Sequence, residues 1–200
     1  MKRFLLLLLA VAVPALPVFA QVSAETWNLD PAHSAAHFAV RHMGISTVRG
    51  AFSKLSGTVQ YDPAHPEQSV LDVTIDANSV DTRVEMRDKD LRSPNFFDVE
   101  KYPTITFKSK KVESAGQGKL TITGDLTIHG VTKEAVLHVD GPNGPIKDPR
   151  GNQHMGAAAT TQVNRKDFGV SGQPTGVGDD ITITLDVEMV KRAAAAPAAK

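Results

Sequence analysis

Residues 119–129 read KLTITGDLTIH, and this stretch decides the fold class. Its apolar residues stand at even positions from Leu120 to Ile128, with threonine or aspartate at the odd positions between them. Successive side chains of a strand point to opposite faces, so the pattern predicts a strand with one apolar and one wet face. Such strands are typical of antiparallel sheets, because buried parallel strands are apolar throughout.

The same alternation recurs along the chain, notably over 71–77 and 181–189. Short turn sequences at Ser114–Gly118 and at Gly130 predict that 104–112, 119–129 and 133–139 form a meander of neighbouring strands. Two Gly- and Pro-rich segments, 141–153 and 171–180, are predicted to be long loops. Altogether we predict strands near 26–30, 34–42, 46–61, 69–77, 104–113, 119–129, 132–140, 157–167 and 180–190.

One predicted strand contains a change of parity. Apolar or small residues hold even positions from Val48 to Phe52 and odd positions from Leu55 to Tyr61. Because a one-residue slip moves every side chain to the other face, a bulge or sharp bend is needed at Ser53-Lys54. This predicts a long strand bent around the wall of a barrel.

One helix is predicted, near 83–92. Thr82 and Glu85 have the spacing of a capping box, and Pro94 ends the segment. Its aspartates, Asp88 and Asp90, are interpreted as solvated charges. About eight strands hide their edges most easily by closing, so we predict an all-β, extended antiparallel barrel with this helix across one end.

The two ends of the chain differ from the rest. A basic start, an apolar run over 4–13 and small or apolar residues up to Ala20 indicate a secretory signal peptide, residues 1–20, cleaved after Ala20. The alternative is an uncleaved anchor. We predict the barrel domain over 21–190, a disordered Ala/Pro tail over 191–200, and a periplasmic or secreted protein.

Composition excludes several functions. Removing residues 1–20 takes away two of the 22 basic residues and none of the 22 acidic ones, which leaves a net charge of −2. A near-neutral chain lacks the basic surface that nucleic-acid binding requires. The absence of cysteine excludes disulfides, thiolate metal sites and thiol catalysis.

Three histidines, His33, His37 and His42, fall close together in the sequence. On a strand, His33 and His37 would share a face but lie about 13 Å apart, and His42 would face the other way. A bend near Gly44 would be needed to bring His42 closer. We therefore expect no metal site, and imidazoles hydrogen-bonded in the wall or near a mouth.

The apolar face of the strands is the feature that could carry function. An ordinary packed core and a ligand cavity produce the same pattern. Gly124 removes a side chain from this face, which favours a cavity, although a corner of the barrel is the alternative.

Five segments together resemble one known family. They are 27–34 with Phe38, His42 and Gly44; 48–52 with Gly57, Tyr61 and Asp62; Arg87-Asp88, 91–93, 95–98, Tyr102-Pro103 and Phe107; 120–132; and 164–170. In order and content they are similar to the YceI-like family, also called the polyisoprenoid-binding family. Asp90 and Asn95 depart from the residues usual there, which weakens any head-group role for the helix.

The resemblance implies a lipocalin-like barrel, secreted or periplasmic, with a tunnel for a long isoprenoid chain such as a polyprenyl lipid or a quinone tail. It implies no enzyme and no cofactor beyond such a bound lipid. We expect passive burial of the tail, no stable membrane span and no nucleic-acid partner; a homodimer stays open.

The predicted ligand-binding residues fall into two groups. The inward apolar candidates are Phe38, Val40, Val73, Ile75, Ile105, Phe107, Ile122, Leu126, Ile128, Ile183 and Leu185. The candidates for head-group contacts near a mouth are His33, His42 and Arg87. Two alternatives remain at this point: a lipid-modifying or hydrolytic enzyme with histidines at the pocket mouth, and an envelope stress protein with a filled core.

Overall fold

The computed structural model describes residues 24–191, so the predicted signal peptide and nearly all of the predicted tail lie outside the described residues. Within that range strands predominate. The strands are β1 (Glu25–Leu29), β2 (Ala35–His42), β3 (Ser46–Phe52), β4 (Leu55–Tyr61), β5 (Val70–Asp76), β6 (Val80–Asp81), β7 (Thr104–Gly116), β8 (Lys119–Ile128), β9 (Val131–Lys147), β10 (Gln153–Asn164) and β11 (Val177–Lys191). The helices are α1 (Glu85–Arg92) and the 3-10 turns η1 (Pro66–Gln68), η2 (Ala77–Ser79) and η3 (Arg165–Phe168).

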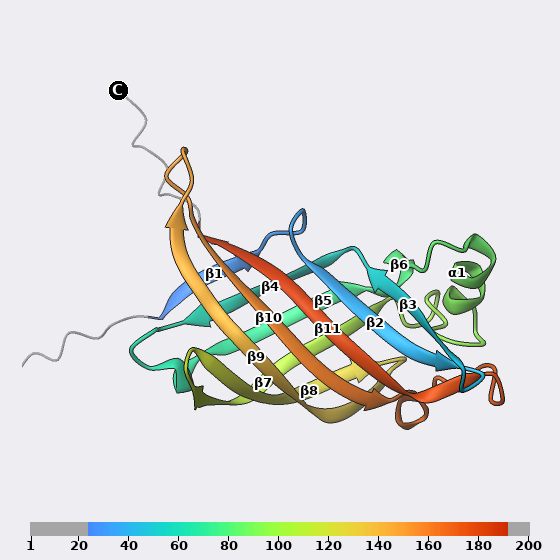
Figure 1. Ribbon diagram of the computed structural model, residues 1–200. Helices are drawn as coiled ribbons and strands as arrows, with labels where there is room; N and C mark the ends of the chain where they lie inside the picture. Colours follow the sequence, from blue (N-terminus) through green and yellow to red (C-terminus); the bar gives the residue numbers. More distant parts are fainter. Residues whose placement is uncertain (1–23, 192–200) are drawn as a thin grey trace, which may run out of the picture.

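The strands close into a barrel. The antiparallel order β1-β4-β5-β7-β8-β9-β10-β11 returns to β1, because β1 also pairs with β11. Strands β2, β3 and β6 extend the wall beside β11. Figure 1 shows an elongated barrel with α1 at one end and the β9–β10 hairpin projecting beyond the other. The predicted all-β antiparallel barrel with one α-helix is confirmed.

The change of parity at Ser53-Lys54 coincides with a break between two strands. β3 ends at Phe52 and β4 begins at Leu55, so the predicted continuous strand is two strands. The η2 turn completes the hydrogen bonding at the break: the Ser53 amide donates to the Ser79 carbonyl (3.4 Å) and the Lys54 amide to the Ser79 hydroxyl (3.2 Å). The register can therefore change without leaving these amide groups unpaired.

Strand β8 has the predicted two-faced character. From Leu120 to Ile128 its even residues are buried and its odd residues are partly exposed. It lies between β7 and β9, which confirms the predicted meander. His129 and Gly130, both with positive φ, make the two-residue turn to β9 that a twisted hairpin favours.

Two predictions of secondary structure were wrong. The segment 141–153 is mostly strand, since β9 continues to Lys147 and β10 resumes at Gln153. Register shifts between β9 and β10 accommodate its glycines and prolines. Thr82 does not cap the helix: the N-cap is Val84, without a side-chain cap.

The Thr82 side chain instead belongs to a buried cluster with Asp88. The Asp88 carboxylate accepts hydrogen bonds from the Thr82 amide (2.8 Å) and from the Thr82 hydroxyl (2.5 Å). Asp88 is only 6% exposed, so its interpretation as a solvated charge was wrong. Its hydrogen bonds are what make burial of a carboxylate tolerable.

Gly124 does not leave empty space. A Cβ atom at this position would lie 2.5 Å from a carbon of the Phe107 ring, so the ring covers the glycine. The glycine therefore makes room for an aromatic ring in the wall, and its interpretation as a source of cavity volume was wrong.

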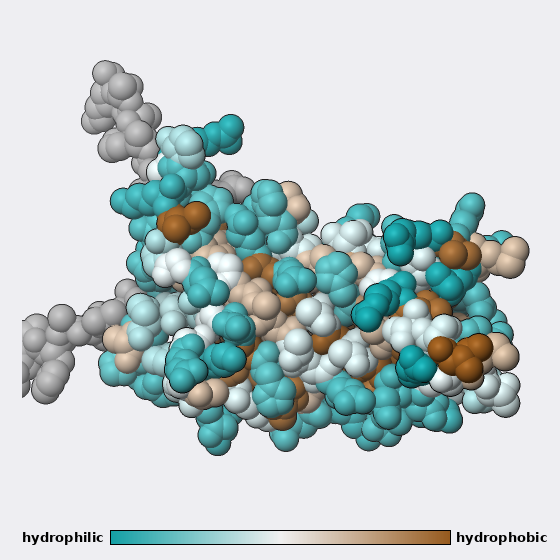
Figure 2. All heavy atoms as spheres, viewed as in Figure 1, coloured by the Kyte–Doolittle hydropathy of each residue, from teal (hydrophilic) through white to brown (hydrophobic). Residues whose placement is uncertain are grey.

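The outer face carries the polar half of each alternating pattern. In the view of Figure 2, hydrophilic and neutral side chains cover most of the surface, and apolar ones appear as separate spots. Over the described range 24–191, no helix has the length and apolar character needed to cross a membrane.

Candidate functional site: an apolar cavity along the barrel

The barrel interior contains a cavity of about 230 Å³ that is lined by side chains from nearly every strand. Its volume lies just below the range of about 300–1,000 Å³ usual for pockets of drug-sized ligands. The lining is overwhelmingly aliphatic and aromatic. Such a space suits a slim hydrocarbon chain better than a bulky polar molecule.

All eleven predicted inward residues line this cavity. They are Phe38, Val40, Val73, Ile75, Ile105, Phe107, Ile122, Leu126, Ile128, Ile183 and Leu185. Pleating explains the agreement, because residues two apart on a strand must face the same side. Whether these residues contact a ligand stays a prediction.

Aromatic rings line the cavity toward the α1 end. The rings of Phe38 and Phe52 lie 5.8 Å apart, and Phe97, just after α1, meets Phe52 edge-on at 5.5 Å. Leu91, on α1 itself, also lines the cavity. The helix segment therefore contributes to the cavity wall as well as covering the barrel end (Figure 1).

A second apolar cluster lies toward the opposite end, where the β9–β10 hairpin projects. Trp27, Met155 and Met189 are each less than 5% exposed and pack together. Tyr61 packs against this cluster and lines the cavity. Burial raises the pKa of the Tyr61 hydroxyl, so it stays a neutral hydrogen-bonding group at physiological pH.

Ser69 is a polar residue in the lining that the sequence did not reveal. It is 7% exposed, it borders the cavity, and its hydroxyl oxygen has no hydrogen-bond partner within residues 24–191. A buried hydroxyl without a partner is costly. Ser69 follows η1, which joins β4 to β5, so it shares the hairpin end of the barrel with Tyr61.

Arg165 is the second polar residue that sequence reasoning missed. Its side chain is only 5% exposed and borders the cavity near Phe168 and Val170. Its guanidinium donates hydrogen bonds to four backbone carbonyls before and at the start of β11, and it forms an ion pair with the Asp179 carboxylate at 3.3 Å. Arg165 therefore holds the segment that leads into β11, and the Asp179 carboxylate balances its charge.

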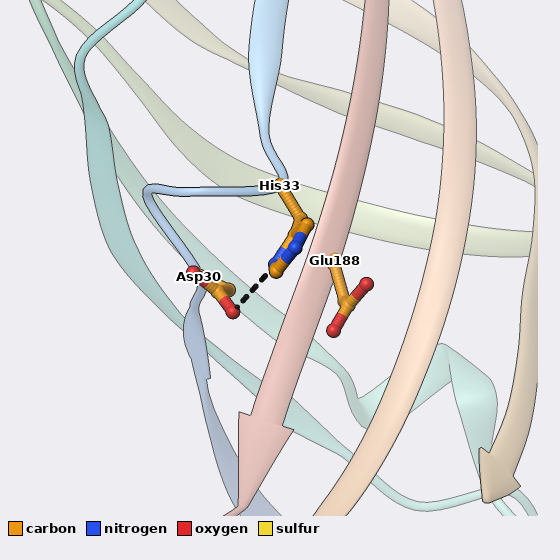
Figure 3. A group of neighbouring side chains, drawn as sticks. All are labelled: Asp30, His33 and Glu188. Carbon is orange, nitrogen blue, oxygen red and sulfur yellow. Dashed lines mark hydrogen bonds and ion pairs between the residues drawn. The ribbon is translucent and has the colours of Figure 1, made fainter.

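The three predicted head-group residues do not line the cavity. Arg87 donates hydrogen bonds to the Thr82 hydroxyl (2.8 Å) and to the Thr82 carbonyl (3.0 Å), so it supports the turn before α1. His42 ends β2, half-buried and beyond the cavity lining. His33 lies on the outside, where its ring is bonded to Asp30 at 3.0 Å (Figure 3).

The enzymatic alternative requires a histidine and a carboxylate that meet at the mouth of the cavity. His33 does meet two carboxylates, Asp30 and Glu188, but none of the three borders the cavity. The hydrogen bond to Asp30 raises the pKa of His33. The hydroxyl of the next residue, Ser34, donates a hydrogen bond to the Glu188 carbonyl (3.3 Å) and accepts one from the Glu188 amide (3.1 Å). Both hydrogen bonds of this hydroxyl are therefore made to the backbone.

A closed barrel around an apolar cavity places the chain among the small β-barrel proteins with an interior pocket. More specifically, the YceI-like domain matches residues 27–189, and the chain belongs to this family. The predicted family is therefore confirmed.

Relatives support the assignment. A UPF0312 protein of Vibrio cholerae serotype O1 is 38% identical over 96% of this chain and 100% of the relative. One from Pseudomonas syringae pv. tomato is 39% identical over 77% of this chain and 80% of its own length.

Solved structures share the architecture. The Campylobacter jejuni YCEI protein is 36% identical over 76% of this chain and 90% of that one, with a TM-score of 0.67. Burkholderia cenocepacia BcnA is 26% identical, and the match covers 82% of this chain and 99% of BcnA, with a TM-score of 0.70. A polyisoprenoid binding domain from Saccharophagus degradans is 15% identical, and the match covers 83% of this chain and 98% of that domain. Its TM-score of 0.58 shows that it shares the fold.

Proposed function

We propose that this protein binds a long isoprenoid chain, or a similar amphipathic lipid, inside the barrel and carries or sequesters it outside the cytoplasm. The observation that carries the proposal is the apolar cavity enclosed by the strands. The isoprenoid class is suggested by family membership and by the polyisoprenoid binding domain that shares the fold.

Passive burial is sufficient as a mechanism. Each methylene removed from water contributes about 0.8 kcal/mol, so a tail binds tightly with few polar contacts. Pockets of this kind combine an apolar lining with a small number of polar groups that fix orientation. Tyr61 and Ser69 supply such groups at the hairpin end, whereas Phe38, Phe52 and Phe97 form an apolar end.

This distribution gives the proposed lipid a direction. Its polar group would lie near Ser69, and its tail would extend toward the aromatic rings beside α1. A hydrogen bond from the ligand would also satisfy the Ser69 hydroxyl, which has no partner within the described residues.

The proposed location outside the cytoplasm is based on the N-terminal sequence. The first twenty residues have the order of charge, apolar run and small residues of a signal peptide. A carrier for membrane lipids would work in the aqueous space next to the membrane, and the periplasm is such a space. A filled-core structural role would require an interior without a cavity, and an enzymatic role would require reactive groups facing the ligand.

Affinity should rise with tail length until the cavity is full. Titration of the delipidated protein with prenyl alcohols that differ by one isoprene unit should show at least about a tenfold gain per unit for the shorter tails, because each added unit buries further carbon. Isothermal titration calorimetry measures this directly. Equal affinity for all tail lengths, or for polyethylene glycols of matched length, would contradict burial of the tail.

A further inference from the structure

The outer surface of the barrel carries a group of side chains that the proposed lipid binding does not use. Asp30, His33 and Glu188 each direct one potential metal-ligand atom toward the others, and these three atoms lie within 4.8 Å of one another. Figure 3 shows His33 and Asp30, from the connection between β1 and β2, beside Glu188 on β11. It is the one group of this kind within residues 24–191.

Hydrogen bonds to the backbone of Glu188 hold the two segments together. The Asp30 amide donates to the Glu188 carbonyl at 2.8 Å. The Ser34 hydroxyl donates to that same carbonyl and accepts from the Glu188 amide. The connection that carries Asp30 and His33 is therefore fixed against β11 whether or not an ion is bound, and the ligand atoms are brought together in advance.

A second set of contacts orients the Glu188 carboxylate. The His154 ring, on β10, is hydrogen-bonded to Glu188 at 2.7 Å and to Asp148 at 3.3 Å. Polar partners that orient a ligating group in this way commonly surround protein metal sites and tune their affinity. His154 is accordingly a positioning residue here.

We propose that Asp30, His33 and Glu188 form a surface site for a divalent transition-metal ion of the Zn²⁺ type. One imidazole nitrogen and two carboxylate oxygens suit such an ion, with water completing the tetrahedral set. Ligand atoms bound at about 2.1 Å each are at most about 4.2 Å apart. The exposed His33 ring and the partly exposed carboxylates can close to that separation by small side-chain rotations.

The site lies at the seam where the barrel closes. Strands β1 and β11 pair there through only two residue pairs, Asn28 with Val190 and Leu29 with Met189. An ion held between the β1–β2 connection and β11 would cross-link the two sides of this seam. Metal binding would therefore stabilise the closed barrel, because a ligand that binds only the folded state raises its stability.

The test uses the mature protein, freed of metal with a chelator, and Zn²⁺ alone as the probe. Calorimetry should show one Zn²⁺ per chain, and His33→Ala and Glu188→Gln should each weaken binding at least about tenfold. His65→Ala is the matched control, because His65 pairs with Glu67 on the surface at 3.4 Å and no third potential ligand joins them among residues 24–191. Its Zn²⁺ affinity should equal that of the wild type.

Thermal unfolding gives a second measurement. Zn²⁺ should raise the Tm of the wild type and of the His65→Ala variant, but not that of His33→Ala or Glu188→Gln. Circular dichroism without metal verifies that each variant is folded. Absence of Zn²⁺ binding by the wild type would overturn the proposal, as would an equal loss of affinity in the His65→Ala variant. Neither result bears on lipid binding.

Discussion

Replacing Arg165 with methionine should lower the free energy of unfolding by roughly 3–5 kcal/mol, the largest loss we expect from any single substitution. The guanidinium donates to the carbonyls of Val170 (2.8 Å), Gly172 (2.8 Å), Val177 (3.1 Å) and Gly178 (2.9 Å). Methionine has a comparable length but donates no hydrogen bond. The segment leading into β11 would lose its internal support.

Urea denaturation followed by circular dichroism measures the effect. Lys166→Met is the matched control: Lys166 is the next residue, it is exposed, and it pairs at 2.8 Å with Asp179, the same carboxylate that pairs with Arg165. An exposed pair contributes about 0–1 kcal/mol. Arg165→Lys should recover only part of the stability, because one ammonium group cannot reach four carbonyls. Similar losses for Arg165→Met and Lys166→Met would contradict this account.

Placing an aromatic ring inside the cavity should weaken lipid binding about a hundredfold while the barrel stays folded. Ala159, on β10, is buried and lines the cavity, so Ala159→Phe would fill space that the tail needs. Displacing three or four buried carbons costs the ligand about 0.8 kcal/mol each, which corresponds to a loss of affinity on the order of a hundredfold. Stability should change by less than about 2 kcal/mol, because the cavity accepts the ring.

The neighbouring residue provides the control. Ala158 is exposed and points to the opposite face of the same strand. Ala158→Phe adds the same side chain outside the barrel and should bind the lipid as the wild type does. Titration with a prenyl alcohol that binds the wild type compares the three proteins. Unchanged affinity in Ala159→Phe would show that the lipid binds elsewhere.

The agreement between sequence and structure is best where short-range geometry decides the outcome. Parity along a strand determines which side chains share a face, so the cavity-lining residues followed from the sequence. The same rule located an irregularity at Ser53-Lys54, although the structure has a break between β3 and β4 there and not a bend in one strand. The turn at Gly130 was predictable because few residues adopt positive φ.

The features that the sequence did not predict depend on contacts between distant segments. The Asp88 carboxylate is buried because the chain before α1 folds back over it, and a polar helix sequence gives no sign of this. Glu188 meets His33 only because β11 closes the barrel beside β1. The extension of β9 through two prolines depends on pairing with β10, which local propensity does not report.

The central claim is that the barrel interior holds a lipid tail. Mass spectrometry of organic extracts from protein purified under native conditions, without detergent, tests it most directly. We predict an isoprenoid or similar long-chain lipid in the wild-type extract, close to one per chain, and its loss from Ala159→Phe but not from Ala158→Phe. Repeated extracts without such a lipid, or equal amounts in both variants, would contradict the account.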